Sequence, residues 1–197
     1  MDRAQIVRLT EEYGGDWEVQ HARRILKLSA LIGEGRNYST DIVWVAAHLR
    51  NWGACPKFAR AGVARAARSV EVAQPYLVEA QCQAEWIPKI LEAIAAEAGD
   101  PRLGGLEAVL VAEADALDGL GLVGVLREFA MIPAKLRGTY STPTNAGMRG
   151  AFERVVVRAE NQPALLRLEK SRALARERVV RMRELFRAFE EETFGYF

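Results

Sequence analysis

The stretch DIVWVAAHLRNWG, residues 41–53, decides the fold class. Residues 42–47 are all apolar, and no Gly or Pro interrupts the stretch before Gly53, so we predict a buried helix from Asp41 to Trp52. Arg50 and Asn51 lie near the end of this apolar helix, and we expect both side chains to point inward. Because a buried polar group without a partner is costly, other parts of the chain must supply partners for them.

Helical periodicity also dominates on both sides of this stretch, and no segment shows the sustained alternation of a strand. Asp2 and Asp16 are predicted N-caps of the first two helices, with Gly14–Gly15 between them. Further helices are expected from residue 63 into the eighties, kinked or broken at Pro75, and over 86–98 and 106–119. Another is expected over 121–138, broken near Pro133, and the last helices run from 148 almost to the end. We predict an all-α protein of about eight or nine helices. It forms one domain over residues 1–197, with the helices of 148–197 packed on it.

The charge balance and the apolar runs exclude several classes of partner. The chain has 27 basic and 26 acidic side chains, a net charge of +1, which argues against nucleic acid or an anionic membrane as the main partner. No apolar run reaches the roughly 20 residues of a membrane span, and the N-terminus has no apolar signal core. With only two cysteines and no disulfide framework, the expected location is the cytoplasm.

The last 30 residues carry an apolar stripe flanked by alternating Arg and Glu. This pattern favours a solvated, salt-bridged helix face over a nucleic-acid surface. The stripe packs on the rest of the chain or forms a dimer, so a monomer and a homodimer both stay open.

Four motifs, in chain order, resemble the HD-domain superfamily of metal-dependent phosphohydrolases. They are HARRI (21–25), AAHLRNWGA (46–54), GVARAARSVEVA (62–73) and EADALDGLGLVGVLREFA (113–130). The resemblance covers about residues 10–135. It implies that His21 is the first metal ligand, that Asp115 is the last, and that Arg24 matches the arginine following the first ligand.

The chain departs from the family pattern at the metal ligands. Arg50 and Asn51 stand where the family carries its His-Asp pair. Arg65 and Glu97 stand where one branch of the family often carries two further histidines. His48 cannot replace the missing ligand at position 50, because two positions correspond to about 200° around an α-helix. We therefore expect a packing or surface role for His48.

These substitutions remove lone pairs that a metal needs. A guanidinium stays protonated and has no lone pair, and Asn51 offers only a neutral carbonyl. His21 and Asp115 alone fall short of the three protein ligands of a typical catalytic zinc site. We predict that the usual metal site is absent and that the chain has no metal or other cofactor.

The replaced residues could instead neutralise one another. We expect Arg50 to pair with Asp115 in place of the metal, and Arg65 to pair with Glu97. The predicted network fills the former metal pocket with the side chains of His21, Arg50, Asn51, Arg65, Glu97 and Asp115. Within it, His21 and Asp115 are the candidate acid-base residues. Arg24 and Lys135, a loosely matched phosphate-contacting position, complete the expected pocket.

Three functions are compatible with this sequence. The first is a degenerate HD-domain protein that binds a small ligand, with anions among the candidates, or a protein partner. The second is a metal-independent enzyme that reuses the pocket for acid-base chemistry on an organic substrate, with His21 and Asp115 carrying protons. The third is a metal-dependent phosphohydrolase of a nucleotide or phosphomonoester, acting through an unrecognised ligand set.

Overall fold

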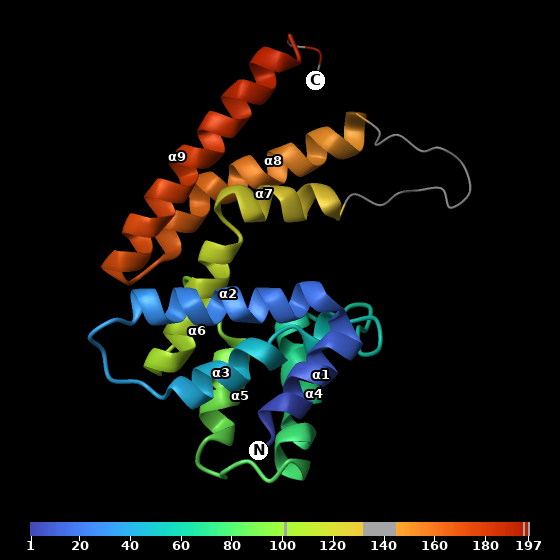
Figure 1. Cartoon of the computed structure of the whole chain (residues 1–197), viewed down its shortest axis with the longest axis vertical. Helices are drawn as coiled ribbons and strands as arrows, with labels where there is room; N and C mark the ends of the chain where they lie inside the picture. The colour runs from blue at the N-terminus through green and yellow to red at the C-terminus, as the bar shows by residue number, and fades with distance from the viewer. Residues whose placement is uncertain (101, 132–144, 195, 197) are drawn as a thin grey trace. The chain divides into compact units, whose positions relative to one another are not determined.

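The computed structural model describes residues 1–100, 102–131, 145–194 and 196. This part of the chain contains nine α-helices, two short 3-10 helices and no strand (Figure 1), so the predicted all-α fold class is confirmed. The helices, in chain order, are α1 (Arg3–Gly14), α2 (Asp16–Ile32), α3 (Thr40–Leu49), η1 (Trp52–Ala54), α4 (Arg65–Glu79), α5 (Ile87–Ala95), α6 (Leu106–Asp118), α7 (Gly121–Ala130), α8 (Asn145–Asn161), η2 (Gln162–Leu165) and α9 (Glu169–Glu192). None of the described helices is both long and apolar enough to cross a membrane.

The chain divides into two compact units, Met1–Asp115 and Ala116–Phe197. The first unit contains α1 to α5 and most of α6, and the second contains α7, α8 and α9. The prediction that the whole chain forms one domain stays a prediction.

The ends of α1 and α2 follow local chemistry. The Asp2 carboxylate accepts a hydrogen bond from the Ala4 backbone N–H at 2.8 Å, so the predicted N-cap of α1 is confirmed. Gly15 adopts a φ of +78°, which a residue with a Cβ rarely takes, and it ends α1. The predicted cap at Asp16 is wrong, because Gly15 itself occupies the N-cap position and Asp16 is already the first residue of α2.

Helix α3 ends earlier than the sequence predicts. Ser39 caps its start, but the helix stops at Leu49, and Arg50 and Asn51 lie in the turn that leads to η1. Gly53 then packs so closely on α4 that a Cβ at this position would overlap the Ser69 backbone nitrogen, and the Gly53 N–H donates to Ser69 Oγ at 3.0 Å. The turn therefore places Gly53 against α4.

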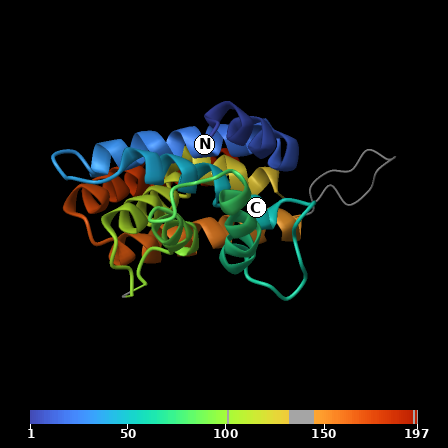
Figure 2. The same ribbon diagram turned by 90° about the horizontal axis from the view of Figure 1, so that it is seen from below.

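The first unit is built around α3, which packs against α1, α2 and α5. Figures 1 and 2 show α3 running alongside α2. Trp52 is fully enclosed just after α3, and its Nε1 donates to Thr10 Oγ1 at 3.1 Å, so the one polar atom of the indole is satisfied. This core fixes the turn that carries Arg50.

Later helices differ from the predictions in length. Helix α4 continues through Pro75, so of the predicted kink or break the break does not occur. Helix α5 ends at Ala95, three residues before the predicted Ala98. Helix α7 ends at Ala130, so the expected break near Pro133 lies outside the described residues.

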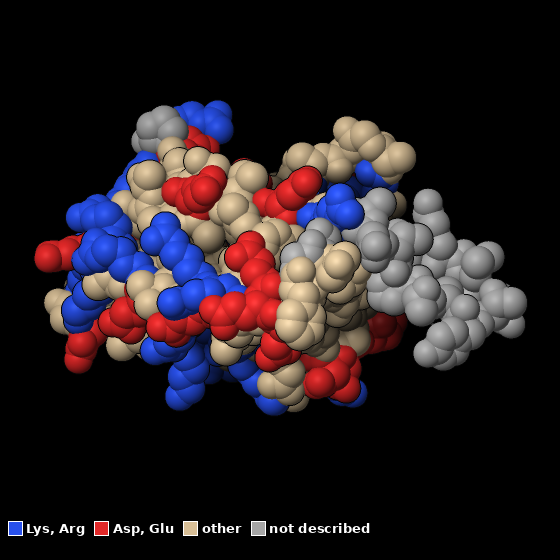
Figure 3. Space-filling view, turned by 90° about the horizontal axis from the view of Figure 1, so that it is seen from above, with Lys and Arg blue, Asp and Glu red and all other residues tan. Residues whose placement is uncertain are grey.

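In the second unit, α7 packs against both α8 and α9. Glu128 of α7 accepts hydrogen bonds from Arg154 at 2.6 Å and Arg158 at 3.0 Å, both from α8. Burial would raise the pKa of Glu128, but these two guanidinium groups hold it below its usual range. Figure 3 shows Lys and Arg interspersed with Asp and Glu over the face seen from above.

Candidate functional site

Asp115 of α6 is the centre of the candidate site. Arg50 Nη2 lies 3.0 Å from its Oδ2, Arg65 Nη2 lies 3.5 Å from the same oxygen, and His21 Nε2 lies 3.2 Å from Oδ1. The three groups come from separate elements: His21 from α2, Arg50 from the turn after α3, and Arg65 from the start of α4. The carboxylate side chain is 15% exposed, so its charge is compensated largely by these neighbours.

Both terminal nitrogens of the Arg50 guanidinium have hydrogen-bond acceptors. Its side chain is only 3% exposed, and its Nη1 donates to the carbonyl oxygens of Ala93 at 3.1 Å and Ile94 at 3.2 Å. These residues lie in the last turn of α5, where carbonyl groups have no intrahelical donor. The predicted Arg50–Asp115 pair is thus formed, and the guanidinium also joins the end of α5 to α6.

The electrostatics of Asp115 follow from this arrangement. Burial alone would raise its pKa, because it disfavours the charged carboxylate. The charge of Arg50, the interaction with His21 and the charge of Arg65 outweigh burial and hold the pKa of Asp115 well below its usual range. Asp115 is therefore ionised throughout the neutral range.

The lowered pKa predicts how stability depends on acid. In the unfolded chain Asp115 titrates near its ordinary value of about 3.9, whereas in the folded protein it holds its charge to lower pH. The unfolded state therefore binds more protons between the two pKa values, and the stabilisation by Asp115 is lost as pH falls below about 4. We expect the free energy of unfolding, measured with urea, to fall less between pH 5 and pH 3 in Asp115→Asn than in the unmodified protein. An equal fall in the two proteins would contradict the lowered pKa of Asp115.

Asn51 and Glu97 do not join the predicted network around Asp115. Asn51 Nδ2 donates to Glu18 Oε2 at 2.7 Å. The predicted Arg65–Glu97 pair is wrong: within the described residues Arg65 pairs with Asp115, and Glu97 is exposed in the loop after α5. The cause is the early end of α5, which leaves Glu97 outside the helix.

Arg24 and Lys135 are the two remaining predicted pocket residues. Arg24 is half-buried on α2, with its guanidinium 4.8 Å from the ring centroid of Trp17. This cation–π contact holds its charge against the start of the same helix. Lys135 lies outside the described residues.

Sequence reasoning missed Glu18 and the α5 carbonyl groups as partners. Glu18 lies three positions before His21 and therefore on the same side of α2, so its position near the site could have been found. The acceptors on Ala93 and Ile94 are backbone atoms, and no side-chain pattern marks them.

His48 and Cys55 both lie near the site but are packed groups. His48 stacks on Trp44 with ring centroids 4.0 Å apart, and burial lowers its pKa, so the ring is neutral. Of the packing and surface roles predicted for His48, the structure shows the packing role. Burial and the charge of Glu18 raise the pKa of the Cys55 thiol to about 11, which keeps it protonated and unreactive at neutral pH.

The residues present do not fit the divalent metal that the HD resemblance implies. In the described ranges no group of three or more His, Cys, Asp or Glu side chains is placed to hold a metal ion. His21 and Asp115 do meet, but the cation beside Asp115 is the Arg50 guanidinium, which cannot act as a ligand. A metal at this carboxylate would also have to overcome repulsion from Arg50 and Arg65.

Among the comparisons with known proteins, the one with solved structures identifies the fold of the chain. No family model and no curated protein matches the chain. Among solved structures, YpgQ of Bacillus subtilis in complex with ADP is 24% identical, with 97% of each chain covered and a TM-score of 0.66. An HD-superfamily hydrolase of Bacillus thuringiensis is 21% identical, with 96% of this chain and 95% of that chain covered and a TM-score of 0.66. A predicted HD superfamily hydrolase from an uncultured Thermotogales bacterium is 18% identical over 96% and 92% of the two chains, with a TM-score of 0.65. The chain therefore has the HD-superfamily fold.

Proposed function

We propose that this chain is an HD-fold binding protein without metal-dependent phosphohydrolase activity, and that its ligand is a small phosphate-bearing anion. The observation that carries the proposal is the Arg50 guanidinium, buried 3.0 Å from Asp115. HD enzymes use a metal at this carboxylate to activate water for attack on a phosphoester. A guanidinium supplies the positive charge but cannot coordinate and activate the water.

The charge around Asp115 supports an anionic ligand. The guanidinium groups of Arg50 and Arg65 face the single carboxylate of Asp115, so these three side chains together carry one excess positive charge. Arg50 is enclosed, but the Arg65 side chain is 37% exposed and can reach a ligand from solvent. Guanidinium groups bind phosphate oxygens in a bidentate manner. The ADP bound by YpgQ supports a nucleotide as the first ligand to try.

A second candidate function is metal-independent acid-base chemistry. The observation that favours it is the 3.2 Å contact between His21 Nε2 and Asp115 Oδ1. Since Asp115 stays ionised, it would orient the imidazole and stabilise its protonated form, and His21 would carry the proton. However, His21 is only 1% exposed, so a substrate would have to enter the core of the unit to reach it.

Binding measurements on Arg65 test the ligand proposal. We expect ADP or inorganic phosphate to bind the unmodified protein in isothermal titration calorimetry. Arg65→Gln should weaken this binding about tenfold, because a charge-assisted hydrogen bond is lost. The control is Arg60→Gln, an exposed arginine of the preceding loop that pairs with Glu71 at 3.9 Å and should leave binding unchanged.

The same preparation separates the alternatives. Turnover of a phosphomonoester that depends on added Mn²⁺ would contradict the proposal. A metal-independent activity that His21→Asn abolishes would favour the acid-base function instead. Equal effects of Arg65→Gln and Arg60→Gln would exclude Arg65 as a ligand contact.

A further inference from the structure

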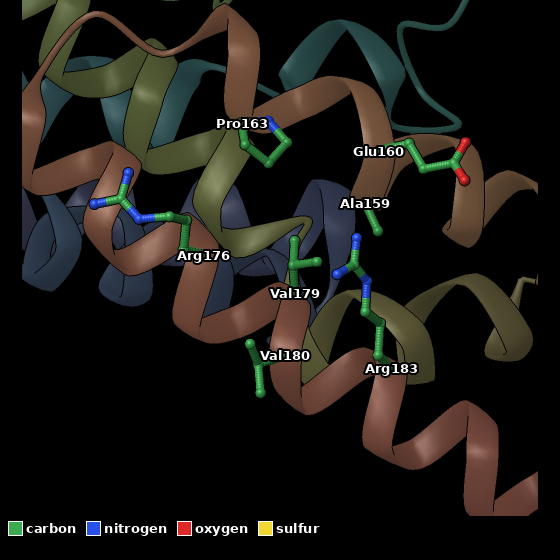
Figure 4. A pocket seen from close by; sticks show the side chains of 7 residues that line it. All are labelled: Ala159, Glu160, Pro163, Arg176, Val179, Val180 and Arg183. Carbon is green, nitrogen blue, oxygen red and sulfur yellow. The ribbon is translucent and has the colours of Figure 1, made fainter.

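The second unit contains a hollow between α8, η2 and α9 that the site around Asp115 does not use. It has a volume of about 350 Å³, within the range of small-molecule sites. Its apolar lining comes from Ala159, Pro163, Val179 and Val180. Three charged residues, Glu160, Arg176 and Arg183, complete it (Figure 4). We call it the α8–α9 hollow.

Both arginines that line the hollow belong to α9. Arg176 and Arg183 are seven positions apart on α9, so they lie within about 20° of each other around the helix and about 10 Å apart along it. Val179 and Val180 lie between them in the sequence. Figure 4 shows the two guanidinium groups well separated, with Val179 between them in the view and Arg183 reaching toward Ala159. The hollow thus presents two cations separated by an apolar surface.

These two charges lack the neighbouring carboxylates that Arg172, Arg181 and Arg187 of α9 have. On a helix, the positions that can neutralise a side chain are three and four residues away. For Arg176 and Arg183 these positions hold only Arg, Ala, Val and Phe, although α9 is rich in Glu elsewhere. Both side chains are exposed, and within the described residues neither forms an ion pair. Glu160 supplies the single carboxylate of the hollow.

We infer that the α8–α9 hollow binds an organic dianion whose two acidic groups are separated by an extended apolar body, since the two arginines leave α9 about 10 Å apart along the helix. One acidic group pairs with Arg176 and the other with Arg183. The apolar body covers Val179 and Val180, of which Val180 is 51% exposed without a ligand. A ligand with one acidic group, or with two that are close together, satisfies only one of the two arginines. This inference does not depend on the function proposed for the Asp115 site.

Linear dicarboxylates test this geometry directly. In isothermal titration calorimetry on the full chain, decanedioate should bind at one saturable site. Butanedioate, which is too short, and decanoate, which has one carboxylate, should each bind at least about fivefold more weakly. Arg176→Gln and Arg183→Gln should each weaken decanedioate binding by at least about fivefold.

The matched control is Arg181→Gln. Arg181 is also exposed on α9, but it lies on another side of the helix and has Glu177 and Glu184 at helix-neighbour positions, so its loss should leave binding unchanged. All three arginines are exposed, so circular dichroism should show the same helix content in each variant. The inference is overturned if decanedioate shows no saturable binding, if decanoate binds equally well, or if Arg176→Gln and Arg183→Gln behave like Arg181→Gln.

Discussion

Replacement of Arg50 by methionine should lower the free energy of unfolding by about 3–5 kcal/mol. The buried Asp115 carboxylate would lose its nearest cation, and the carbonyl oxygens of Ala93 and Ile94 would lose their donor. Methionine retains much of the arginine volume, so the loss reports on charge and hydrogen bonding more than on a cavity. Urea unfolding at pH 7, followed by circular dichroism, measures the change.

Two variants make this result specific to the pair. Arg60→Met removes an exposed arginine whose partner Glu71 also pairs with Arg68, and it should leave the unfolding midpoint nearly unchanged. The double variant Arg50→Met with Asp115→Leu removes both charges and should be more stable than the two separate losses predict. Strictly additive losses would mean that Arg50 and Asp115 do not stabilise one another.

Restoring the family residues, by Arg50→His together with Asn51→Asp, should convert the site into one that binds a metal. The change removes the guanidinium and supplies one imidazole and one carboxylate as metal ligands, in addition to those of His21 and Asp115. Without metal the double variant should be strongly destabilised, because Asp115 loses its cation and the new carboxylate lies where Asn51 now bonds Glu18. Added Mn²⁺ should recover about 2.7 kcal/mol at a hundredfold excess over the dissociation constant.

Thermal unfolding with and without Mn²⁺ checks this prediction without any activity assay. The unmodified protein is the first control and should show no shift. Arg50→His alone is the second, and it should show a smaller shift because one ligand is missing. If the double variant gains no stability from Mn²⁺, positions 50 and 51 do not correspond to the family's ligand pair.

Much of the fold could be predicted because its signals are local. The Asp2 cap, the apolar run of α3 and the glycines that end helices all act within a few residues. The errors arose where tertiary contacts decide the outcome. Helix α3 ends at Leu49 because Gly53 must approach Ser69 of α4, a contact between segments that no local pattern records.

The candidate site, like the fold, could be predicted only in part. The HD resemblance brought His21, Arg50 and Asp115 together, since a shared fold implies shared positions. In the structure His21 Nε2 lies 3.2 Å and Arg50 Nη2 lies 3.0 Å from an Asp115 carboxylate oxygen. The partner of Arg65 could not be predicted in this way. Arg65 at the start of α4 pairs with Asp115, and Glu97 lies beyond the end of α5, which is an outcome of tertiary packing that no local pattern records.

The metal content of the purified protein tests the central claim most directly, namely that the Arg50 guanidinium replaces the HD metal. Protein incubated with Mn²⁺, Fe²⁺, Ni²⁺ and Zn²⁺ and then dialysed should be analysed by plasma mass spectrometry. The account predicts far less than one metal ion per chain, with the same trace amount in His21→Ala. About one ion per chain in the unmodified protein, lost in His21→Ala, would contradict it.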